Sequence, residues 1–128
     1  MASSYTGSIR LEKPAAGDYP LGWSSVYDGT MDLIDTALSG ITSIALAGTT
    51  VTLTTANGAS DQARAAILDV TGTGGTIVVP NVQKTYYVRN RTSGQVILQV
   101  TGTANTITVV TQSAAPMACD GSGGISFV

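Results

Sequence analysis

The chain has 128 residues and a formal net charge of −2, which indicates one domain and carries no electrostatic signature of a nucleic-acid-binding protein. Charged residues make up only 11% of the sequence and hydrophobic residues 43%, whereas an ordinary soluble domain carries about 25% charged residues. A surface so poor in charge is weakly protected against association, and we expect other subunits to cover much of it.

The lack of histidine and the scarcity of cysteine exclude several classes of active site. Without histidine, Ser-His and Cys-His catalytic pairs are impossible and zinc loses a common ligand. The single cysteine, Cys119, is expected to be a small buried apolar residue. The N-terminus does not read as a signal peptide, and no apolar run reaches the ~18 residues that span a bilayer. We therefore expect no enzyme, no cofactor and no membrane contact.

Residues 1–23 show neither helical nor strand periodicity, and glycines and prolines interrupt them, which predicts an extended arm. Such an arm either docks on a neighbouring subunit or folds back on its own domain. Trp23, the only tryptophan, is expected to be a buried anchor at the start of the following helix, with an interface hot spot as its alternative role. The apolar residues of the arm are Tyr5, Ile9, Leu11, Tyr19, Leu21 and Trp23.

Residues 24–40 are predicted to form the one helix, because Tyr27, Met31, Ile34 and Leu38 recur on a single helical face. We expect this face to pack against the β domain or against a sister subunit. Ser24 or Ser25 is expected to cap the N-terminus, and Gly40 to stop the helix as its C′ residue. Three aspartates on another face are interpreted as a solvated acidic surface rather than a cation site: Asp28, Asp32 and Asp35.

From Ile41 onward the hydrophobic period changes to two, and turn residues recur about every ten positions. This pattern predicts a mainly β domain over residues 41–128, a single antiparallel β-sandwich or jelly-roll-like fold. The Gly72–Gly75 run is interpreted as a β-turn rather than a phosphate-binding loop, since no lysine and helix follow it. The expected strands are 41–47, 49–55, 63–70, 76–79, 84–90, 95–101, 106–111, 114–119 and 124–128.

Two β-rich runs within Lys84–Val100 flank the turn-forming sequence Asn90–Gly94, which predicts a hairpin with a long loop. Its basic residues, Lys84, Arg89 and Arg91, are expected to form a surface patch. Tyr86 and Tyr87 beside these arginines could stack on nucleic acid bases, but cross-strand packing in an acidic protein is the interpretation we favour.

The chain resembles a family of tailed-bacteriophage structural domains, usually labelled tail-fibre or virion-surface proteins. The resemblance lies in Leu11–Pro14, Gly17-Asp18 and Gly22-Trp23 running into Met31–Gly40, and in Ile77–Lys84, Tyr87–Gly94 and Cys119–Gly121. It implies an N-terminal arm and helix joined to a β-sandwich, and often a trimer. Relatives are parts of longer fibres, whereas this sequence ends at Val128 without a shaft repeat or receptor-binding tip, which favours a free-standing virion component.

The resemblance implies a capsid decoration protein that binds the phage major capsid protein through its arm and associates with itself, as a homotrimer, on the exterior of the virion after synthesis in the host cytoplasm. The alternative is a tail-fibre or baseplate adaptor bound to a tail protein. A virion glycan hydrolase is disfavoured, because the β region offers only Asp61, Asp69 and Asp120 as carboxylates. The expected partner-binding residues are Tyr5, Ile9, Leu11, Tyr19, Trp23, Tyr27 and Met31.

Overall fold

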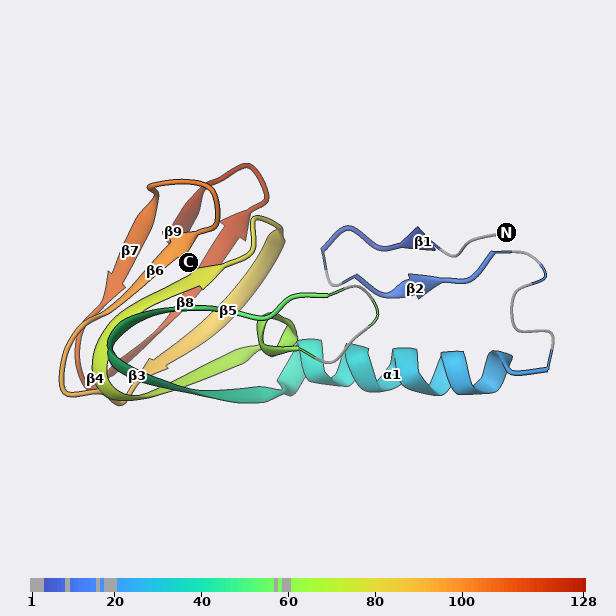
Figure 1. Cartoon of the computed structure of the whole chain (residues 1–128), viewed down its shortest axis with the longest axis horizontal. Helices are drawn as coiled ribbons and strands as arrows, with labels where there is room; N and C mark the ends of the chain where they lie inside the picture. Colours follow the sequence, from blue (N-terminus) through green and yellow to red (C-terminus); the bar gives the residue numbers. More distant parts are fainter. Residues whose placement is uncertain (1–3, 9, 16, 18–20, 57, 59–60) are drawn as a thin grey trace.

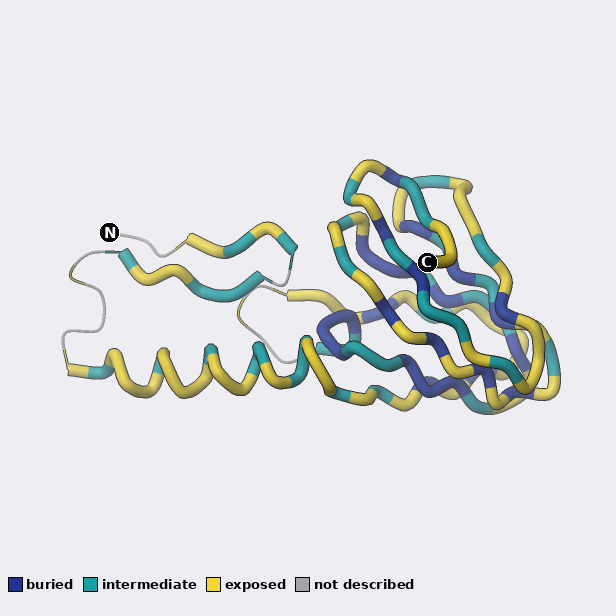
Figure 2. Tube along the Cα trace, turned by 180° about the vertical axis from the view of Figure 1, so that it is seen from behind, coloured by how far each residue is buried: buried dark blue, intermediate teal, exposed yellow. Residues whose placement is uncertain are grey.

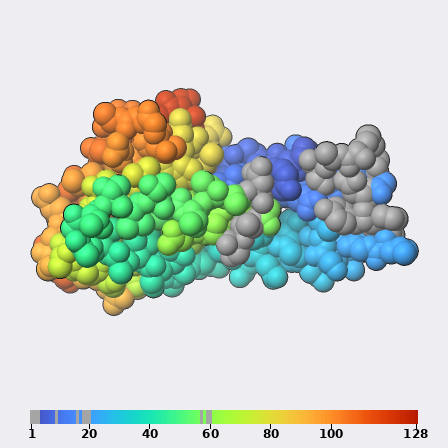
Figure 3. All heavy atoms as spheres, viewed as in Figure 1, coloured from blue at the N-terminus to red at the C-terminus, as the bar shows by residue number. Residues whose placement is uncertain are grey.

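The protein is elongated, with a β domain at one end and a narrow stalk, defined as helix α1 and the β1–β2 hairpin, at the other (Figures 1 and 3). The computed structural model describes residues 4–8, 10–15, 17, 21–56, 58 and 61–128. The stalk elements are β1 (Ser4–Tyr5), β2 (Glu12–Lys13) and α1 (Trp23–Ser39). The β domain contains β3 (Ile41–Thr52), η1 (Gln62–Arg64), β4 (Ile67–Val79), β5 (Gln83–Asn90), β6 (Val96–Val100), β7 (Thr106–Val109), β8 (Ser113–Asp120) and β9 (Ile125–Phe127).

Strands β3–β9 form one seven-stranded sheet in the order β7-β6-β4-β5-β8-β9, with β3 also paired to β4. The sheet folds over on itself until its two ends, β7 and β9, lie close together, so that it is nearly closed (Figure 1). The mainly β class with one short helix, predicted from the change of hydrophobic period, is confirmed.

The sheet folds over on itself because β4 and the segment that follows β5 bend at the same level of the sheet. The first half of β4 pairs with β5, and its second half pairs with β6. Between these halves, Arg91 N–H donates to Val70 O at 2.8 Å and Ser93 N–H donates to Gly72 O at 3.1 Å. Residues 91–95 therefore follow β4 round a corner, from one layer of the folded sheet to the other.

The predicted hairpin at Lys84–Val100 is wrong. The pairings of the described residues join β5 to β4 and β8, and β6 to β4 and β7, but not β5 to β6. The Asn90–Gly94 sequence forms the corner instead. Turn-forming residues satisfy their polar groups locally whether the chain reverses or bends, and so the local signal does not distinguish the two outcomes.

The expected antiparallel pairing also needs correction. β3–β4, β4–β5 and β4–β6 are parallel, whereas β5–β8, β6–β7 and β8–β9 are antiparallel. Each bent strand ends in the layer opposite to the one in which it began. The link at residues 80–82 therefore only has to cross between layers before β5 runs to the beginning of β4, where Tyr87 pairs beside Ile67, and this produces parallel neighbours over a short connection.

The core lies between the two layers and is formed by the inward side of the alternating strand pattern. Cys119 is a free, buried thiol, as expected, and burial raises the pKa of that thiol. Buried hydrophobic residues come from every strand except β9 within the sheet: Ile44, Leu46, Leu68, Val70, Ile77, Val79, Tyr86, Val88, Val96, Leu98, Val100, Val109, Met117 and Cys119.

Gly72–Gly75 does not form the predicted β-turn but lies inside β4 at the corner. Gly72, Gly74 and Gly75 have positive φ values of +106°, +98° and +148°. A Cβ on Gly74 would lie 2.7 Å from Gln95 O, and one on Gly72 would overlap Leu46 O. Glycine is required here because the backbones of β3 and of the 91–95 corner approach β4 closely on either side.

Four predicted strands merge into two, since 41–47 and 49–55 correspond to β3 and 63–70 and 76–79 correspond to β4. The helix was predicted at nearly the observed bounds, but its ends differ in detail. α1 starts after Gly22 without a side-chain cap from the described residues, and not at a serine cap. Gly40 is extended (φ −69°) rather than left-handed, and a Cβ there would lie 2.6 Å from Thr36 O.

Candidate functional site

The stalk is the part of the molecule whose side chains are least covered by the rest of the chain. α1 has 17 residues and is therefore about 25 Å long. All 17 are described, and none of them is buried. The helix leaves the β domain near η1 and runs beyond it, and among the described elements the β1–β2 hairpin lies alongside it (Figures 1 and 2).

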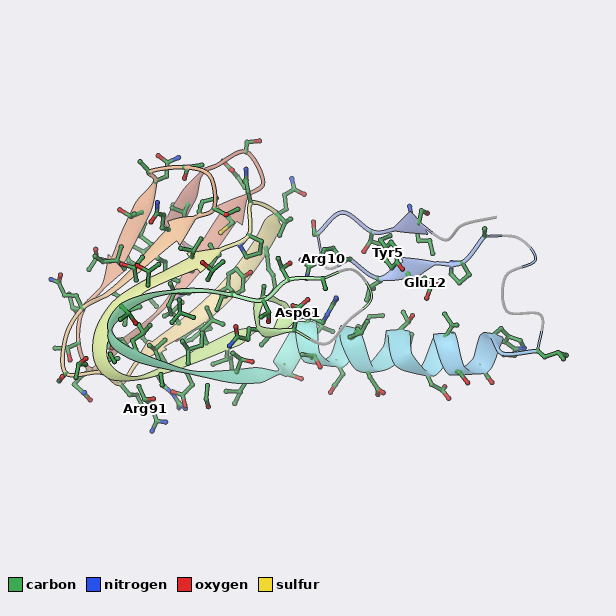
Figure 4. All side chains as sticks on the ribbon, viewed as in Figure 1. Tyr5, Arg10, Glu12, Asp61 and Arg91 are labelled. Atoms are coloured by element: carbon green, nitrogen blue, oxygen red, sulfur yellow. The ribbon has the colours of Figure 1, made fainter. Side chains whose placement is uncertain are left out.

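The hairpin is fastened to the β domain through the loop before η1 (Figure 4). Arg10 Nη2 donates to Asp61 Oδ2 at 3.0 Å, and both side chains are largely shielded from solvent. Gly58 N–H donates to Arg10 O at 2.8 Å, and Asp61 Oδ2 also accepts from Ala56 N–H at 2.7 Å. The described part of the arm therefore folds back on its own chain, which is one of the two arrangements that the sequence left open.

The hairpin covers a different face of α1 from the one predicted to be buried. Val26, Thr30 and Leu33 are half-buried and line a shallow groove with Glu12 of β2. The predicted apolar face is mostly exposed: Tyr27 is 56% and Leu38 76% accessible, Met31 is also exposed, and Ile34 is half-buried. Packing of this face against the β domain is therefore excluded, because the helix projects beyond the sheet.

Trp23 is not the buried anchor that the sequence predicts. Its side chain is 66% exposed and meets the edge of Tyr27, with the ring centroids 6.4 Å apart and the planes inclined at 69°. Leu21, two residues before it, is fully exposed. The alternative role of Trp23, as an interface residue, remains a prediction.

The fluorescence of Trp23 tests that role directly, because no other tryptophan contributes to the emission. When the chain is diluted until it is monomeric, we expect an emission maximum close to that of free tryptophan, since the indole is exposed. Association through the stalk should shift the emission to shorter wavelength. A monomer whose emission is already blue-shifted would contradict the exposed placement.

The other expected partner-binding residues occupy mixed environments. Tyr5 is exposed on β1, beside Gly58, and Leu11 is half-buried next to β2. Ile9 and Tyr19 lie outside the described residues. The expected arm surface is thus represented in the structure by Tyr5 and Leu11, whereas Trp23, Tyr27 and Met31 belong to the helix.

The predicted basic patch does not form as a unit, because Lys84 and Arg89 lie on opposite faces of β5. Arg89 and Arg91 both meet Asp69, whose side chain is buried. Arg89 Nε donates to Asp69 Oδ1 at 3.0 Å, while Arg91 forms a bidentate pair, with Nε 2.9 Å from Oδ1 and Nη2 2.8 Å from Oδ2. These bonds hold the pKa of Asp69 below its ordinary value of 3.8.

The lowered pKa of Asp69 predicts a loss of stability in acid. The unfolded carboxyl group binds protons more readily than the folded one, so its stabilising contribution is complete above about pH 4 and disappears as the pH falls through the folded pKa. In the Asp69→Asn variant this acid-dependent loss should vanish. We expect the substitution to cost about 1 kcal/mol at pH 7, since both guanidinium groups are half-exposed. Urea unfolding between pH 2.5 and 7 measures both effects, and parallel pH profiles for the two proteins would contradict them.

Lys84 points into the β domain rather than out of it. Its Nζ donates to Ala65 O at 3.1 Å and lies 4.3 Å from the centroid of the Tyr86 ring. Burial, with a smaller contribution from Arg64, lowers the pKa of Lys84 to about 8. Tyr86 donates its hydroxyl to Ala63 O at 3.1 Å, and burial raises its pKa. These contacts fasten the η1 segment to β5.

Sequence reasoning missed the polar cluster at the corner. The buried amide of Asn90 donates to Gly94 O at 3.0 Å and Val109 O at 2.9 Å. Its Oδ1 accepts from Thr92 N–H at 2.9 Å and from the Thr92 hydroxyl at 2.6 Å. The Asn-x-Thr-x-Gly spacing is the available signal, since asparagine commonly bonds to a backbone group two residues later.

Across the described residues, three or more histidine, cysteine or acidic side chains do not gather into a metal site, and no helix has the length and apolarity to cross a membrane. Asp28, Asp32 and Asp35 are exposed, in agreement with a solvated acidic face. The distinctive surface is therefore the stalk. No protein-family model, curated protein or solved structure matches the chain.

Proposed function

We propose that the protein is a structural component of a bacteriophage virion, most specifically a capsid decoration protein that binds the major capsid protein from outside through its arm. The observation that carries the proposal is the division of the molecule into a well-packed β domain and a stalk whose apolar side chains are largely exposed. A binding module with this division uses the stalk for attachment and presents the β domain at the surface of the particle.

The β domain has the features of a robust surface module. Its core is continuous, its buried Asn90 and Asp69 have their hydrogen-bonding partners, and its outward strand positions carry mainly threonine, serine and small residues. The resemblance in sequence to phage structural domains supports the assignment to a virion. An enzymatic role is not part of the proposal.

A tail-fibre or baseplate adaptor is the second candidate, and the elongated shape favours it. The N-terminal stalk and the β domain lie at opposite ends, as suits a part that joins one component to the next (Figure 1). In that role the stalk would anchor to the tail, and the β domain would carry a further protein.

Copy number in purified virions separates the two candidates. Quantitative mass spectrometry of the particles, with the major capsid protein as internal standard, should find the chain in numbers comparable with the capsid subunits if it decorates the head. A ratio matching that of tail proteins would support the adaptor. Absence from purified particles would overturn both.

The role of the arm in attachment can be tested on the same particles. Replacing Arg10 by alanine removes the ion pair with Asp61 that fastens the hairpin, while the β domain core is untouched. We expect weaker binding of the added protein to undecorated heads and an unchanged β-type circular dichroism spectrum. Lys13→Ala, an exposed position on the same hairpin, is the matched control.

A further inference from the structure

The exposed apolar residues of α1 follow a heptad repeat. Tyr27, Met31, Ile34 and Leu38 are separated by four, three and four residues. Alternating steps of three and four are the pattern of a coiled-coil seam, with Met31 and Leu38 at a positions and Tyr27 and Ile34 at d positions. We propose that α1 is the self-association surface of this protein, and that it forms a parallel bundle of three or four helices with other copies of the chain.

Most of the seam surface is exposed. The hairpin mainly covers the side of α1 marked by Val26, Thr30 and Leu33, which lies roughly a third of a turn away from the seam. Glu12 and Pro14 also border a groove with Tyr27 and Met31, which stay 56% and 42% exposed. The β domain lies beyond the C-terminal end of the helix and borders Leu38, which stays 76% exposed (Figures 1 and 2). Copies can therefore bring their seams together while the hairpins stay on the outside and all the β domains stay at one end.

The amount of exposed apolar surface is appropriate for such an interface. Trp23, Tyr27, Met31, Leu38 and Ile41 together expose on the order of 600 Å², since a large side chain carries ~150–250 Å². This is at the upper limit of the largest apolar patch on an ordinary monomer, ~300–600 Å², and near the ~800 Å² that each partner contributes to a standard interface. A second copy of the same helix matches the repeat from Tyr27 to Leu38.

Charge selects the direction of the helices. Asp28 and Asp35 fall at e positions, and the g positions that face them across a parallel interface are Trp23 and Thr30. In a parallel bundle each e position lies beside a g position of the neighbour, so the aspartates meet uncharged residues. An antiparallel pair would place e beside e and bring aspartates together, which repel each other. Parallel association is therefore favoured.

The residue types at the seam select the number of helices. Leucine at a with isoleucine at d favours three or four strands over two, and Leu38 and Ile34 provide that combination at the C-terminal half of α1. Self-association through α1 is a property of the purified chain and does not depend on the proposed role in a virion.

Sedimentation equilibrium of the full chain at micromolar concentration tests the seam. We expect a mass three or four times the 13.0 kDa of one chain for the wild type, and a single-chain mass for the double variant Met31→Glu/Leu38→Glu. Both replaced side chains are exposed in the monomer, so its circular dichroism spectrum should be unchanged. Val110→Glu, an exposed apolar position directly after β7 in the β domain, is the control and should assemble normally. A monomeric or dimeric wild type, or a double variant that assembles like the wild type, would overturn the proposal.

Disulfide cross-linking between copies tests whether the α1 helices associate in parallel. Ser24 occupies an a position near the N-terminal end of α1, and Ser25 occupies the adjacent b position on the outside. In a parallel bundle the cysteines of Ser24→Cys meet and form disulfides between copies under mild oxidation, whereas in an antiparallel pair they would be separated by about the 25 Å length of the helix. The buried Cys119 does not compete. Linkage through Ser24→Cys that does not exceed that through Ser25→Cys would overturn the parallel arrangement.

Discussion

Replacing Gly72 by alanine is expected to unfold the protein or to remove most of its stability. The residue has a φ of +106°, a conformation that costs an L-residue ~1–3 kcal/mol. A Cβ there would in addition overlap Leu46 O on the neighbouring strand β3. The backbone of β3 cannot move away without breaking its pairing with β4. We expect a loss of about 4 kcal/mol or more, a large part of the ~5–15 kcal/mol typical of a domain.

Chemical denaturation of Gly72→Ala and Gly29→Ala measures this effect against a matched control. Gly29 lies inside α1 with open space around the position of a Cβ, so alanine there should stabilise the helix by ~1 kcal/mol. The same substitution should thus have opposite signs at the two sites. Equal stability of Gly72→Ala and the wild type would show that the corner is not closely packed.

Asn90→Leu is expected to have the next largest effect. The side chain of Asn90 is buried and forms four hydrogen bonds across the corner, two as donor and two as acceptor. Leucine has a similar volume but leaves Val109 O and the Thr92 hydroxyl with fewer partners in a site that excludes water. We expect a loss of about 2–4 kcal/mol in the free energy of unfolding, measured by urea denaturation.

Gln112→Ala is the control at the same corner. Gln112 Nε2 donates to Thr92 O at 3.1 Å, but its side chain is exposed and water can replace the bond. Its loss should cost well under about 1 kcal/mol. A similar cost at both positions would mean that burial of the amide is not what makes Asn90 important.

The strands were predictable because each depends on local alternation of apolar and polar residues. The order of pairing was not, as Lys84–Val100 illustrates. Its two strands have the composition of a hairpin, and Asn90–Gly94 has the composition of a turn, yet the chain follows β4 round the corner. Neighbours in a sheet are chosen by contacts between residues far apart in sequence, and the hydrophobic period is the same for either choice.

The exposed surface of α1 was only partly predictable for the same reason. The spacing of Tyr27, Met31, Ile34 and Leu38 identified the apolar face of α1, and that face exists. Its exposure depended on where the helix leaves the β domain, which no residue of the helix specifies. Trp23 was assigned to the interior because a large aromatic side chain is usually buried, but its side chain is 66% exposed.

By itself, the sequence determined the mainly β class, the single helix and its apolar face, the buried Cys119 and the lack of a histidine-based active site. These properties follow from composition and from periods of two and 3.6 residues, which are local. Only the tertiary structure decided that β4 bends at Gly72–Gly75, that Arg89 and Arg91 converge on Asp69, and that α1 stands clear of the sheet. Each of these depends on backbones from distant parts of the chain approaching one another, and such approaches have no signature within a short stretch of residues.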